Sequence, residues 1–585
     1  MGAVDGPTPR YTWRLRPSPE VDPVLVEAGR MLGMGHRLVH LLAARGHDDP
    51  AALQAWVGDP VAALHDPRQL PDAEAFVARV ARATADNERV MVFGDFDADG
   101  LTGLAILTLA LRRLELDVVP YVPDRTEEGH GLSRPALQRA AAEGRTLIVT
   151  ADCGTSSADE IELARQHGID VLVTDHHRPP PRLPAAAAVV NPLRADSAYP
   201  DRHLSGAGVA LKCAQLLIGG GEAMKLADLA AIGTIADVAP LVGENRSIAR
   251  LGLDALAGGP RPGLAALLAN ARIEPGRINP ETLAFGLIPR LNAMGRVGDA
   301  QLAARLLLSD DPAEATDLAA QLDQANVTRR ELLATALEEA RTAVGEAPDG
   351  PVIVIAGPWA AGIIGLVAGR LAELHGRPAV VFSNTTDPWR GSARSPSMDI
   401  VSALASMADL FERFGGHSAA AGCHMPASNI DAFRQRMALA AGSLRPIEPT
   451  LDIDLIVEAV EVDYGLRTDL LRLEPAGPRN PLPLVGIRGL VVSRARRANG
   501  GHTQLVLRKG REVLDGICFG RDDLPDVVRE GDRLDVVARL DSRTFGGYES
   551  LQLEVRDVGP AGTLDALMSA RAPVEVLREA VALSA

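Results

Sequence analysis

The sequence predicts a multidomain α/β protein, in which a doubly wound parallel sheet is followed by a smaller α/β domain and a β-barrel. Strand-like and helix-like segments alternate from about residue 85, and the same alternation begins again at Val352. After about residue 448 the pattern changes to closely spaced strands with turns. Alternation of strands and helices is typical of parallel sheets, whereas closely spaced strands are typical of sandwiches and small barrels.

Changes in these patterns divide the chain of 585 residues into six segments. They are a helical, proline-containing N-terminal lead-in (1–80), the parallel-sheet domain (81–311), a long polar-faced connector helix (312–348), the smaller α/β domain (349–447), an OB-fold-like barrel (448–558) and a helical tail (559–585). The composition, with 46% hydrophobic and 23% charged residues, is that of a folded globular protein.

Five short apolar segments predict the strands of the first sheet. They are "RVMVF" (89–93), "DVVPYV" (117–122), "TLIVTA" (146–151), "DVLVT" (170–174) and "AAVVN" (187–191). Each is rich in β-branched residues, and helical patterns lie between several of them. Such continuous apolar runs are expected for strands that are buried on both faces, as in a parallel sheet covered by helices.

Five further segments predict the barrel. They begin at Leu484, His502, Glu512, Asp532 and Glu549, and an OB-fold is the architecture that their number and spacing favour. Basic residues and two aromatic residues are interleaved among them: Arg488, Arg494, Arg496, Arg497, Lys509, Arg511, Arg543, Phe545 and Tyr548. Single-strand-binding proteins combine basic grooves with stacking rings, but a solvated charged face has the same composition, so both interpretations stay open from the residues alone.

Bulk properties exclude several classes of protein. A net charge of −16 argues against a uniformly positive surface and still allows a local basic groove. Four widely separated cysteines without a C-x-x-C pair predict neither a disulfide framework nor a zinc knuckle, so the cytoplasm is the expected compartment. One uncharged stretch, residues 351–369, has the length of a membrane span. Pro358 and four glycines break it into strand, loop and helix, so no membrane span is expected.

Three aspartates, two residues apart, follow the first predicted strand. Asp95, Asp97 and Asp99 precede Gly100, as at the start of an EF-hand loop. That loop requires a bidentate glutamate at its twelfth position, where this chain has Ile106. The acids instead sit in a strand-to-helix turn at the carboxyl end of a strand, which is where open α/β sheets bind ligands.

Further acidic residues and histidines are expected at the same edge. Asp152 follows one strand, Asp175, His176 and His177 follow another, and Asp237 ends a predicted helix. Clustered carboxylates repel each other, and divalent cations remove this repulsion. Several aspartates and one imidazole can hold two metal ions about 3.5–4 Å apart, the arrangement used for in-line attack on phosphorus. Asp175 is expected to orient the metal-binding imidazole.

The alternative for each single aspartate is a structural role. A lone aspartate after a strand is usually the N-cap of the next helix, and a lone histidine pair is usually surface or core filling. The coincidence of four such clusters favours the metal site.

The motifs "GDFDADG", "ADCGTS", "VTDHH" and "IADVAP" occur in this order, and with them the chain resembles the DHH phosphoesterase family. "FGLIPRLNAMGRVGDA" (285–300), "GIIGLVAGRLAE" (362–373), "GSARS" (391–395) and "FGGHSAAAG" (414–422) add to the resemblance, which covers essentially residues 45–558. It implies a DHH phosphoesterase domain at 81–311, a DHH-associated domain at 349–447 and a nucleic-acid-binding OB-fold-like barrel at 448–558.

The resemblance also implies roles for individual residues. The implied metal ligands are Asp95, Asp97, Asp99, Asp152, His176 and Asp237, with Asp152 bridging two Mn²⁺ or Mg²⁺ ions and Asp95 acting as a ligand or as a partner of one. His177 joins Asp97, Asp99, Asp152, His176 and Asp237 in the catalytic set, because it would contact the scissile phosphate. The implied substrate-binding residues are Gly415, Gly416 and His417 at the nucleotide, and Ser392 and Arg394 at a terminal 5′-phosphate, with Arg296 or Arg290 as a partner. For each arginine taken alone, a surface salt bridge is the alternative.

The implied activity is metal-dependent 5′→3′ exonucleolytic hydrolysis of single-stranded DNA to mononucleotides, in DNA repair and recombination. Single-stranded DNA is the expected partner, and a single-strand-binding protein and a helicase are further candidates. One alternative is a DHH-family phosphodiesterase on short oligonucleotides or cyclic dinucleotides. Another is a non-catalytic replication scaffold, against which the intact set of aspartates and histidines argues.

Overall fold

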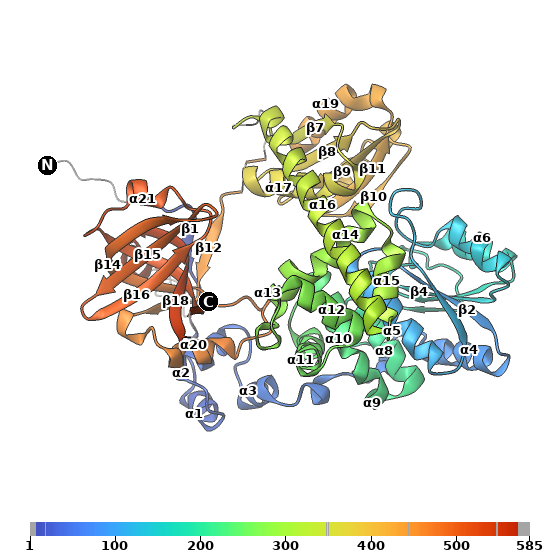
Figure 1. The fold of residues 1–585 in the computed structure, drawn as a ribbon, viewed down its shortest axis with the longest axis horizontal. Coiled ribbons are helices and arrows are strands. Elements are labelled where there is room, and N and C mark those ends of the chain that lie inside the picture. The colour runs from blue at the N-terminus through green and yellow to red at the C-terminus, as the bar shows by residue number, and fades with distance from the viewer. Residues whose placement is uncertain are drawn as a thin grey trace, which may run out of the picture. The chain divides into compact units, whose positions relative to one another are not determined.

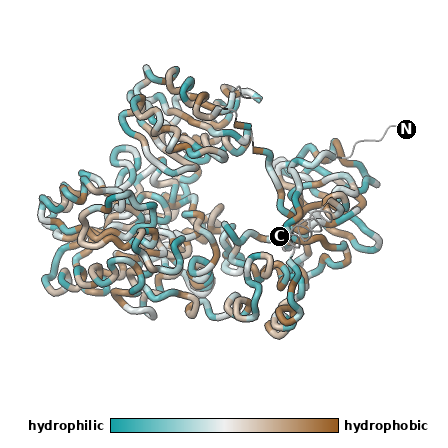
Figure 2. Tube along the Cα trace, turned by 180° about the vertical axis from the view of Figure 1, so that it is seen from behind, coloured by the Kyte–Doolittle hydropathy of each residue, from teal (hydrophilic) through white to brown (hydrophobic). Residues whose placement is uncertain are grey.

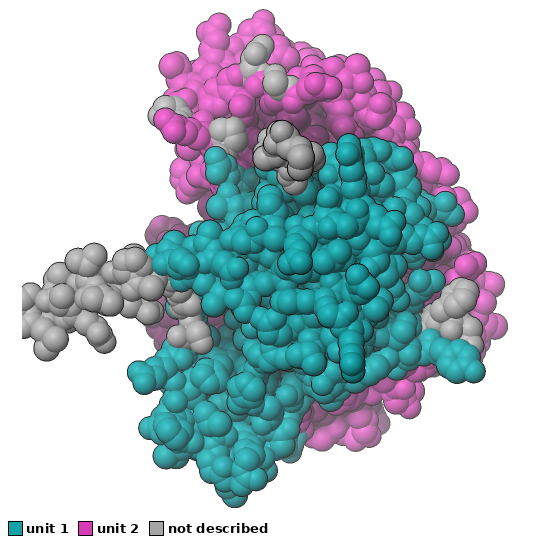
Figure 3. Space-filling view, turned by 90° about the vertical axis from the view of Figure 1, so that its left-hand side faces the viewer, with its two compact units in different colours: residues 1–59, 448–474, 481–585 teal, residues 60–447, 475–480 magenta. Residues whose placement is uncertain are grey.

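The computed structural model describes residues 7–570 except for residues 18, 347, 349, 443, 446, 546 and 547. The chain forms two compact units, coloured separately in Figure 3. Unit 2 comprises residues 60–447 and 475–480, and unit 1 comprises residues 1–59, 448–474 and 481–585. In Figure 2 the hydrophobic, brown stretches of the trace lie mostly in the interior of each unit.

The first sheet of unit 2 is parallel, as predicted, and its strand order is β3-β2-β4-β5-β6. The strands are β2 (Arg89–Gly94), β3 (Asp117–Tyr121), β4 (Leu147–Ala151), β5 (Asp170–Thr174) and β6 (Ala188–Val190). The chain runs from β2 outward to β3 and then returns to β4 on the other side. The gap between the carboxyl ends of β2 and β4 is therefore the switch point, where doubly wound sheets bind ligands.

Helices cover both faces of this sheet (Figure 1). Val90 and Val92 of β2 pack with α4 (Ala73–Ala85), α5 (Ala98–Arg112) and α8 (Gly206–Ile218). Met91 and Phe93 point to the other face and pack with α6 (Arg134–Ala142) and α7 (Ala158–Gln166). Because successive side chains of a strand point to opposite faces, a strand between two helical layers must be apolar throughout, as "RVMVF" is.

The region after this sheet is helical. It contains α9 (Gly220–Ala223), α10 (Ala227–Ala236), α11 (Gly243–Gly258), α12 (Pro262–Ala271), α13 (Pro280–Thr282), α14 (Ile288–Val297), α15 (Ala300–Leu308) and α16 (Pro312–Val344). The long helix α16 belongs to two cores. Leu318 and Leu322 pack in the core of the first sheet, and Ala336 and Ala340 pack beside α17 (Ala361–His375). This shared helix joins the two α/β domains into one unit.

A buried ion pair fixes the start of unit 2. Lys212 of α8 lies 2.8 Å from Glu244 of α11, and their side chains are 1% and 0% exposed. The Lys212 ammonium also donates to the carbonyl of His65, and Glu244 accepts from the Tyr199 hydroxyl and the His65 amide. The network therefore holds residues 60–70 against the helical core.

The second sheet of unit 2 has the order β10-β11-β9-β8-β7. The strands are β7 (Ile353–Gly357), β8 (Ala379–Ser383), β9 (Trp389–Arg394), β10 (Arg413–His417) and β11 (Ala420–Met425), and α18 (Ile400–Ala405) and α19 (Ile430–Ala441) accompany them. Only β7 and β8 are parallel. Residues 351–369 form β7, a loop and the start of α17, as predicted. Among the described residues, none of the helices combines the length and apolarity needed to span a bilayer.

Unit 1 contains a closed five-stranded barrel, which confirms the third part of the predicted fold. The strands are β14 (Val485–Ala498), β15 (His502–Lys509), β16 (Glu512–Cys518), β17 (Arg533–Phe545) and β18 (Tyr548–Pro560). Pairing of β14 with β17 closes the ring, and β13 (Leu455–Val457) adds to β14. The helices α20 (Tyr464–Leu471) and α21 (Leu524–Val527) belong to the same unit.

The N-terminal residues are part of unit 1. The strand β1 (Thr12–Leu15) pairs in parallel with β12 (Thr450–Ile453), and the helices α1 (Pro23–Met31), α2 (His36–Ala44) and α3 (Pro50–Val57) share a core with the barrel. The buried carboxylate of Asp557 accepts from the Trp13 indole at 2.8 Å and from two backbone amides of the N-terminal segment. The sequence did not predict this pairing. Of the predicted helical tail (559–585), residues 559–560 end β18, residues 561–562 form a turn and residues 563–570 are helical, while residues 571–585 lie outside the described residues.

Candidate metal centre

The turn after β2 carries the three spaced aspartates into the start of α5. Asp97 is the N-cap of α5, and its carboxylate accepts from the amides of Asp99 and Gly100. A Cβ atom at Gly100 would lie 2.5 Å from the carbonyl oxygen of Asp95, so only glycine fits there. The cap leaves the Asp99 carboxylate directed at α8, where it accepts from the amides of Gly206 and Ala207 at 2.7 and 2.8 Å.

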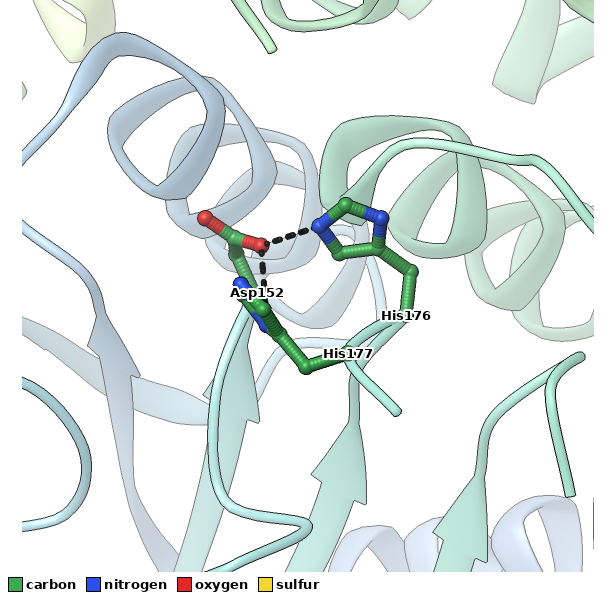
Figure 4. Close-up of side chains that lie close together, drawn as sticks. All are labelled: Asp152, His176 and His177. Atoms are coloured by element: carbon green, nitrogen blue, oxygen red, sulfur yellow. Dashed lines mark ion pairs between the residues drawn. The ribbon is translucent and has the colours of Figure 1, made fainter. Parts of the chain in front are cut away.

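Asp152 follows β4 in a left-handed backbone conformation. Its φ of 62° lies in the left-handed region, which residues other than glycine, asparagine and aspartate rarely adopt. The side chain is 4% exposed, and Oδ1 lies 3.0 Å from Nε2 of His176 and 3.8 Å from Nδ1 of His177 (Figure 4). Nevertheless, this buried oxygen accepts no hydrogen bond from any described residue. A buried carboxylate oxygen without a hydrogen-bond donor is suited to binding a cation.

His176 lies between two groups of candidate ligands. Asp152, His176 and His177 each have a ligand atom within 4.8 Å of the others, and so do Asp99, His176 and Asp237. Nε2 of His176 is 3.8 Å from Asp99 Oδ2, and Nδ1 is 3.8 Å from Asp237 Oδ2. Residues from four separate turns therefore converge on one imidazole.

Asp175 orients the second histidine of the pair. Its Oδ1 lies 2.8 Å from Nδ1 of His177 and also accepts from the amides of His176 and His177. The expectation that Asp175 would orient the ring of the metal-binding imidazole, His176, is wrong, because the ring that it holds is that of His177. The imidazole ring of His177 also stacks on that of His417 in β10, with ring centres 5.4 Å apart.

Burial and mutual repulsion raise the pKa of the clustered carboxylates. Burial raises the pKa of Asp152 well above its usual range, and the charges of Asp99 and Asp97 raise it further. Burial also raises the pKa of Asp97 and Asp99. Although burial opposes protonation of His177, its hydrogen bond to Asp175 raises its pKa to about 9. The site thus has excess negative charge that a cation would neutralise.

The stability of the metal-free protein is expected to fall as the pH rises from about 4 to about 6. Burial and the charge of Asp99 raise the pKa of Asp237 from 3.8 to about 6. Between these two pH values the folded state binds a proton at Asp237 that the unfolded state has lost. Protonated Asp237 therefore adds about 2–3 kcal/mol to the free energy of unfolding below pH 4, and this contribution is lost as the pH passes 6. Urea unfolding without metal should show a smaller fall in stability over this pH range for Asp237→Asn than for the wild type, because the raised pKa values of Asp97, Asp99 and Asp152 remain. The exposed Asp254→Asn is the control, and equal pH profiles for all three proteins would contradict the assignment.

Asp95 and Asp97 lie outside the two groups of converging ligand atoms. Asp95 accepts from the amide of Phe96, and its Oδ2 is 2.9 Å from Nδ1 of His130. Oδ1 of Asp97 accepts the two backbone hydrogen bonds that cap the N-terminus of α5. Their charges nevertheless raise the pKa of Asp152, so both lie near it. Their roles as ligands stay predictions.

A cluster of arginines lies beside the carboxylates. Burial lowers the pKa of Arg296 to about 9, and the charges of Arg125, Arg329 and Arg394 lower it further. Burial and the charge of Arg125 also lower the pKa of Arg394, whose guanidinium donates to the Ser392 hydroxyl at 3.1 Å. Several buried cations that repel one another form a suitable pocket for an anion such as a phosphate.

Arg290 points elsewhere. It pairs with Asp323 of α16 at 2.8 Å and donates to the carbonyl of Gly286. Of the two alternatives for the partner of Arg394, the structure therefore favours Arg296 over Arg290. Gly415 and Gly416 lie in β10, directly before His417.

Sequence reasoning missed Arg125 and His130. Both lie in the loop that follows β3, and Arg125 sits 4.5 Å over the ring of Phe96 while interacting with Asp95 and Asp97. The same rule that located the aspartates would have located this loop, because it too follows the carboxyl end of a strand in the same sheet.

The side chains present fit a divalent cation. Carboxylate oxygens with one imidazole are a donor set suited to Mn²⁺ and Mg²⁺, and Asp152 Oδ1 supplies a buried acceptor that lacks a donor.

Comparison with known proteins agrees with this geometry. Three family models match: the DHH family N-terminal domain at residues 89–234, the DHHA1 domain at residues 349–442 and the RecJ OB domain at residues 453–557. The single-stranded-DNA-specific exonuclease RecJ of Bacillus subtilis is 34% identical over 527 residues, which cover 88% of this chain and 67% of that protein. RecJ of Dickeya dadantii is 35% identical over 537 residues, covering 85% of this chain and 92% of that protein.

The chain belongs to the RecJ family. A crystal structure of RecJ from Thermus thermophilus in complex with Mn²⁺ matches with a TM-score of 0.80 and 30% identity, covering 94% of this chain and 79% of that one. The Mg²⁺ complex of RecJ from the same organism matches with a TM-score of 0.75. The predicted DHH membership and three-part fold are therefore confirmed.

Proposed function

We propose that this RecJ-family protein is a metal-dependent exonuclease that hydrolyses single-stranded DNA from its 5′ end to mononucleotides. The observation that carries the proposal is the convergence of Asp99, Asp152, His176 and Asp237 at the switch point of the sheet. We also propose the cytoplasm as its compartment and DNA repair and recombination as its context.

Two divalent ions, Mn²⁺ or Mg²⁺, would supply charge neutralisation and an activated water when bound. Asp99, Asp152, His176 and Asp237 would hold them, with Asp152 between the two and Asp95 and Asp97 as further ligands or supports. Burial already places the carboxylate of Asp152 beside His176 in the protein without metal. Such preorganisation removes the cost of gathering like charges during the reaction.

We propose that His177 contacts the scissile phosphate. Asp175 holds its Nδ1, so its other ring nitrogen is free to donate to a phosphate oxygen. In the protein without metal, burial opposes protonation of His177, but the hydrogen bond to Asp175 raises its pKa to about 9. A protonated imidazole can stabilise negative charge that develops on the phosphate. His417 stacks on it, and with Gly415 and Gly416 would contact the nucleotide.

The buried arginines would select the end of the strand. Arg394, Arg296 and Ser392 form a cationic pocket that would accept a terminal 5′-phosphate, and Arg125 extends it toward Asp95. A phosphodiester within a DNA strand is not a terminal dianionic phosphate. The pocket would therefore favour the end of a DNA strand over internal positions.

Arg394→Ala is expected to reduce the preference for a 5′-phosphorylated over a 5′-hydroxyl strand by about 10- to 100-fold, because a charge-assisted hydrogen bond is lost. The measurement is the ratio of hydrolysis rates on the two strands. The control is Arg434→Ala, which removes an exposed arginine paired with Asp431 on α19. An unchanged ratio in Arg394→Ala would remove this residue from the pocket.

We also propose that the barrel provides a second binding site for single-stranded DNA. Arg494, Arg496 and Arg543 line a hollow of about 220 Å³ on its surface, together with Gln504 and Gln552. Arg488, Arg497 and Lys509 pair with acidic residues, and Arg496 donates to the side-chain oxygen of Gln504. We propose that Arg494, Arg496 and Arg543 bind the phosphate backbone of single-stranded DNA. A single-strand-binding protein and a helicase are further proposed partners, testable by co-purification after nuclease treatment.

A digestion time course tests the proposed activity. Strands labelled at the 5′ or 3′ end, as DNA and as RNA, single-stranded and duplex, would be incubated with Mn²⁺ or Mg²⁺. Immediate release of a labelled mononucleotide from the 5′ end of single-stranded DNA is expected. Turnover limited to dinucleotides or cyclic dinucleotides would favour the small-substrate phosphodiesterase. No turnover with either metal would favour the scaffold.

A further inference from the structure

Residues 475–480, with the sequence Pro-Ala-Gly-Pro-Arg-Asn, form a short turn that we name the clasp. We propose that the clasp positions two metal ligands, Asp237 and Asp99, by holding the loops next to them. The inference rests on the proposed metal site and assigns residues outside the DHH domain to its assembly. The clasp belongs to unit 2, although the chain on both sides of it belongs to unit 1.

The clasp is a closed turn with a rigid base. Gly477 and Asn480 exchange backbone hydrogen bonds of 2.9 and 3.0 Å, which leaves Pro478 and Arg479 at the tip. Asn480 is 1% exposed, and its side chain donates to the carbonyl of Pro475. A two-residue turn closed in this way and braced by a buried side chain presents its tip in one conformation.

The first contact of the clasp is with the loop after Asp237. The amide of Leu241 donates to the carbonyl of Pro478 at 2.9 Å, and Leu241 is 1% exposed. A Cβ atom on Gly477 would lie 2.7 Å from Cδ1 of Leu241, so the glycine allows the leucine side chain to pack directly on the clasp backbone. Only three residues separate Leu241 from Asp237.

That loop is strained, and it needs support at both ends. Val238, next to Asp237, has a φ of 59° and a side chain that is 66% exposed. A β-branched residue in the left-handed region is unfavourable and persists only where its surroundings enforce it. The amide of Ala239 is bound to the carbonyl of Thr234 inside unit 2, and the clasp binds the far end at Leu241. Without the clasp, the far end of this loop loses that backbone hydrogen bond.

The second contact leads to Asp99. Nη1 of Arg479 lies 3.5 Å from Nε2 of His203, whose carbonyl accepts from Asn245. The residues that follow His203 start α8, where the amides of Gly206 and Ala207 bind the Asp99 carboxylate. The clasp therefore touches both loops that carry or bind a metal-site carboxylate. The Ser205 and Thr234 hydroxyls, 3.1 Å apart, join the two loops to each other.

Gly477→Val tests the clasp, because the added side chain would displace Leu241. Free Mn²⁺ would be titrated by electron paramagnetic resonance in the absence of DNA, with the full-length chain. We expect Mn²⁺ affinity to fall by about 10-fold, as is typical when the support of a metal ligand is lost. Hydrogen exchange by mass spectrometry should show faster exchange at residues 238–241 and 203–207 and unchanged exchange in β4.

The matched control is Gly220→Val, since a Cβ atom at Gly220 has no heavy atom within 4 Å. It should keep wild-type affinity and exchange. The double variant Gly477→Val with Leu241→Ala should recover most of the affinity, because the smaller side chain makes room for the valine. If Gly477→Val does not fold, Gly477→Ala provides the same test with a smaller expected loss of about 3-fold.

Wild-type Mn²⁺ affinity and wild-type exchange in Gly477→Val would overturn the proposal. So would an affinity loss in Gly220→Val equal to that in Gly477→Val. Failure of the proposed nuclease function is a separate result: the wild-type chain would bind Mn²⁺ and protect residues 238–241 but would not hydrolyse DNA. In that case the clasp would still be judged by the affinity and exchange measurements.

Discussion

Asp152→Asn should lower the rate of metal-dependent DNA hydrolysis by on the order of 10⁴-fold, because it removes the carboxylate that the proposed ions would share. Asparagine is the suitable replacement, since the φ of 62° at this position disfavours alanine and tolerates asparagine. The rate would be measured on 5′-phosphorylated single-stranded DNA with Mn²⁺ in a single-turnover assay.

We expect a second effect of Asp152→Asn that a damaged fold would not cause. Asp152 has a raised pKa from burial and from Asp99 and Asp97, so removing its charge relieves repulsion in the metal-free protein. The variant should therefore be at least as stable as the wild type without metal, and Mn²⁺ should stabilise it less. Asp159→Asn, an exposed acid on α7, is the control. Turnover within tenfold of wild type, in a preparation free of host nucleases, would refute the central role of Asp152.

Lys212→Met is expected to destabilise unit 2 by about 3–5 kcal/mol, because removing one partner leaves a buried charge without compensation. Methionine fills most of the volume but cannot neutralise Glu244, whose side chain is 0% exposed. The hydrogen bonds from Tyr199 and His65 remain and do not replace the lost charge.

Native-state hydrogen exchange of α8 and α11 would measure the change in the free energy of opening. The matched control is Lys225→Met, which removes a lysine from an exposed pair with Glu222 and should leave exchange unchanged. Equal exchange of α8 in the wild type and in Lys212→Met would show that the buried pair adds nothing to the stability of unit 2.

Much of the candidate site could be predicted because its signals are local. A buried parallel strand is a continuous apolar run, so it can be recognised in the sequence. The residues that follow such strands lie at one edge of the sheet. Asp95, Asp152 and His176 could therefore be expected at the same edge from sequence alone. The connector helix was predicted over residues 312–348 and is observed over Pro312–Val344, and its start could be predicted because caps and periodicity are also local.

Features that depend on long-range pairing could not be predicted. The parallel pairing of Thr12 with Thr450 has no local signal, and neither does the contact of Pro478 with Leu241. The partner of Asp175 was predicted incorrectly because adjacency in sequence does not say which of two neighbouring rings turns toward a carboxylate. Arg290 and Arg296 share a motif, and only packing against α16 separates their environments.

The bond between Trp13 and Asp557 joins residues that are 544 positions apart. At ribosomal speeds of about 5–20 residues per second, the first strand waits roughly half a minute to two minutes for its partner to be synthesised. During that interval the apolar faces of α1–α3 have no barrel to cover them, while most of unit 2 can already fold. The N-terminal segment can therefore reach its native environment only after the barrel has been synthesised.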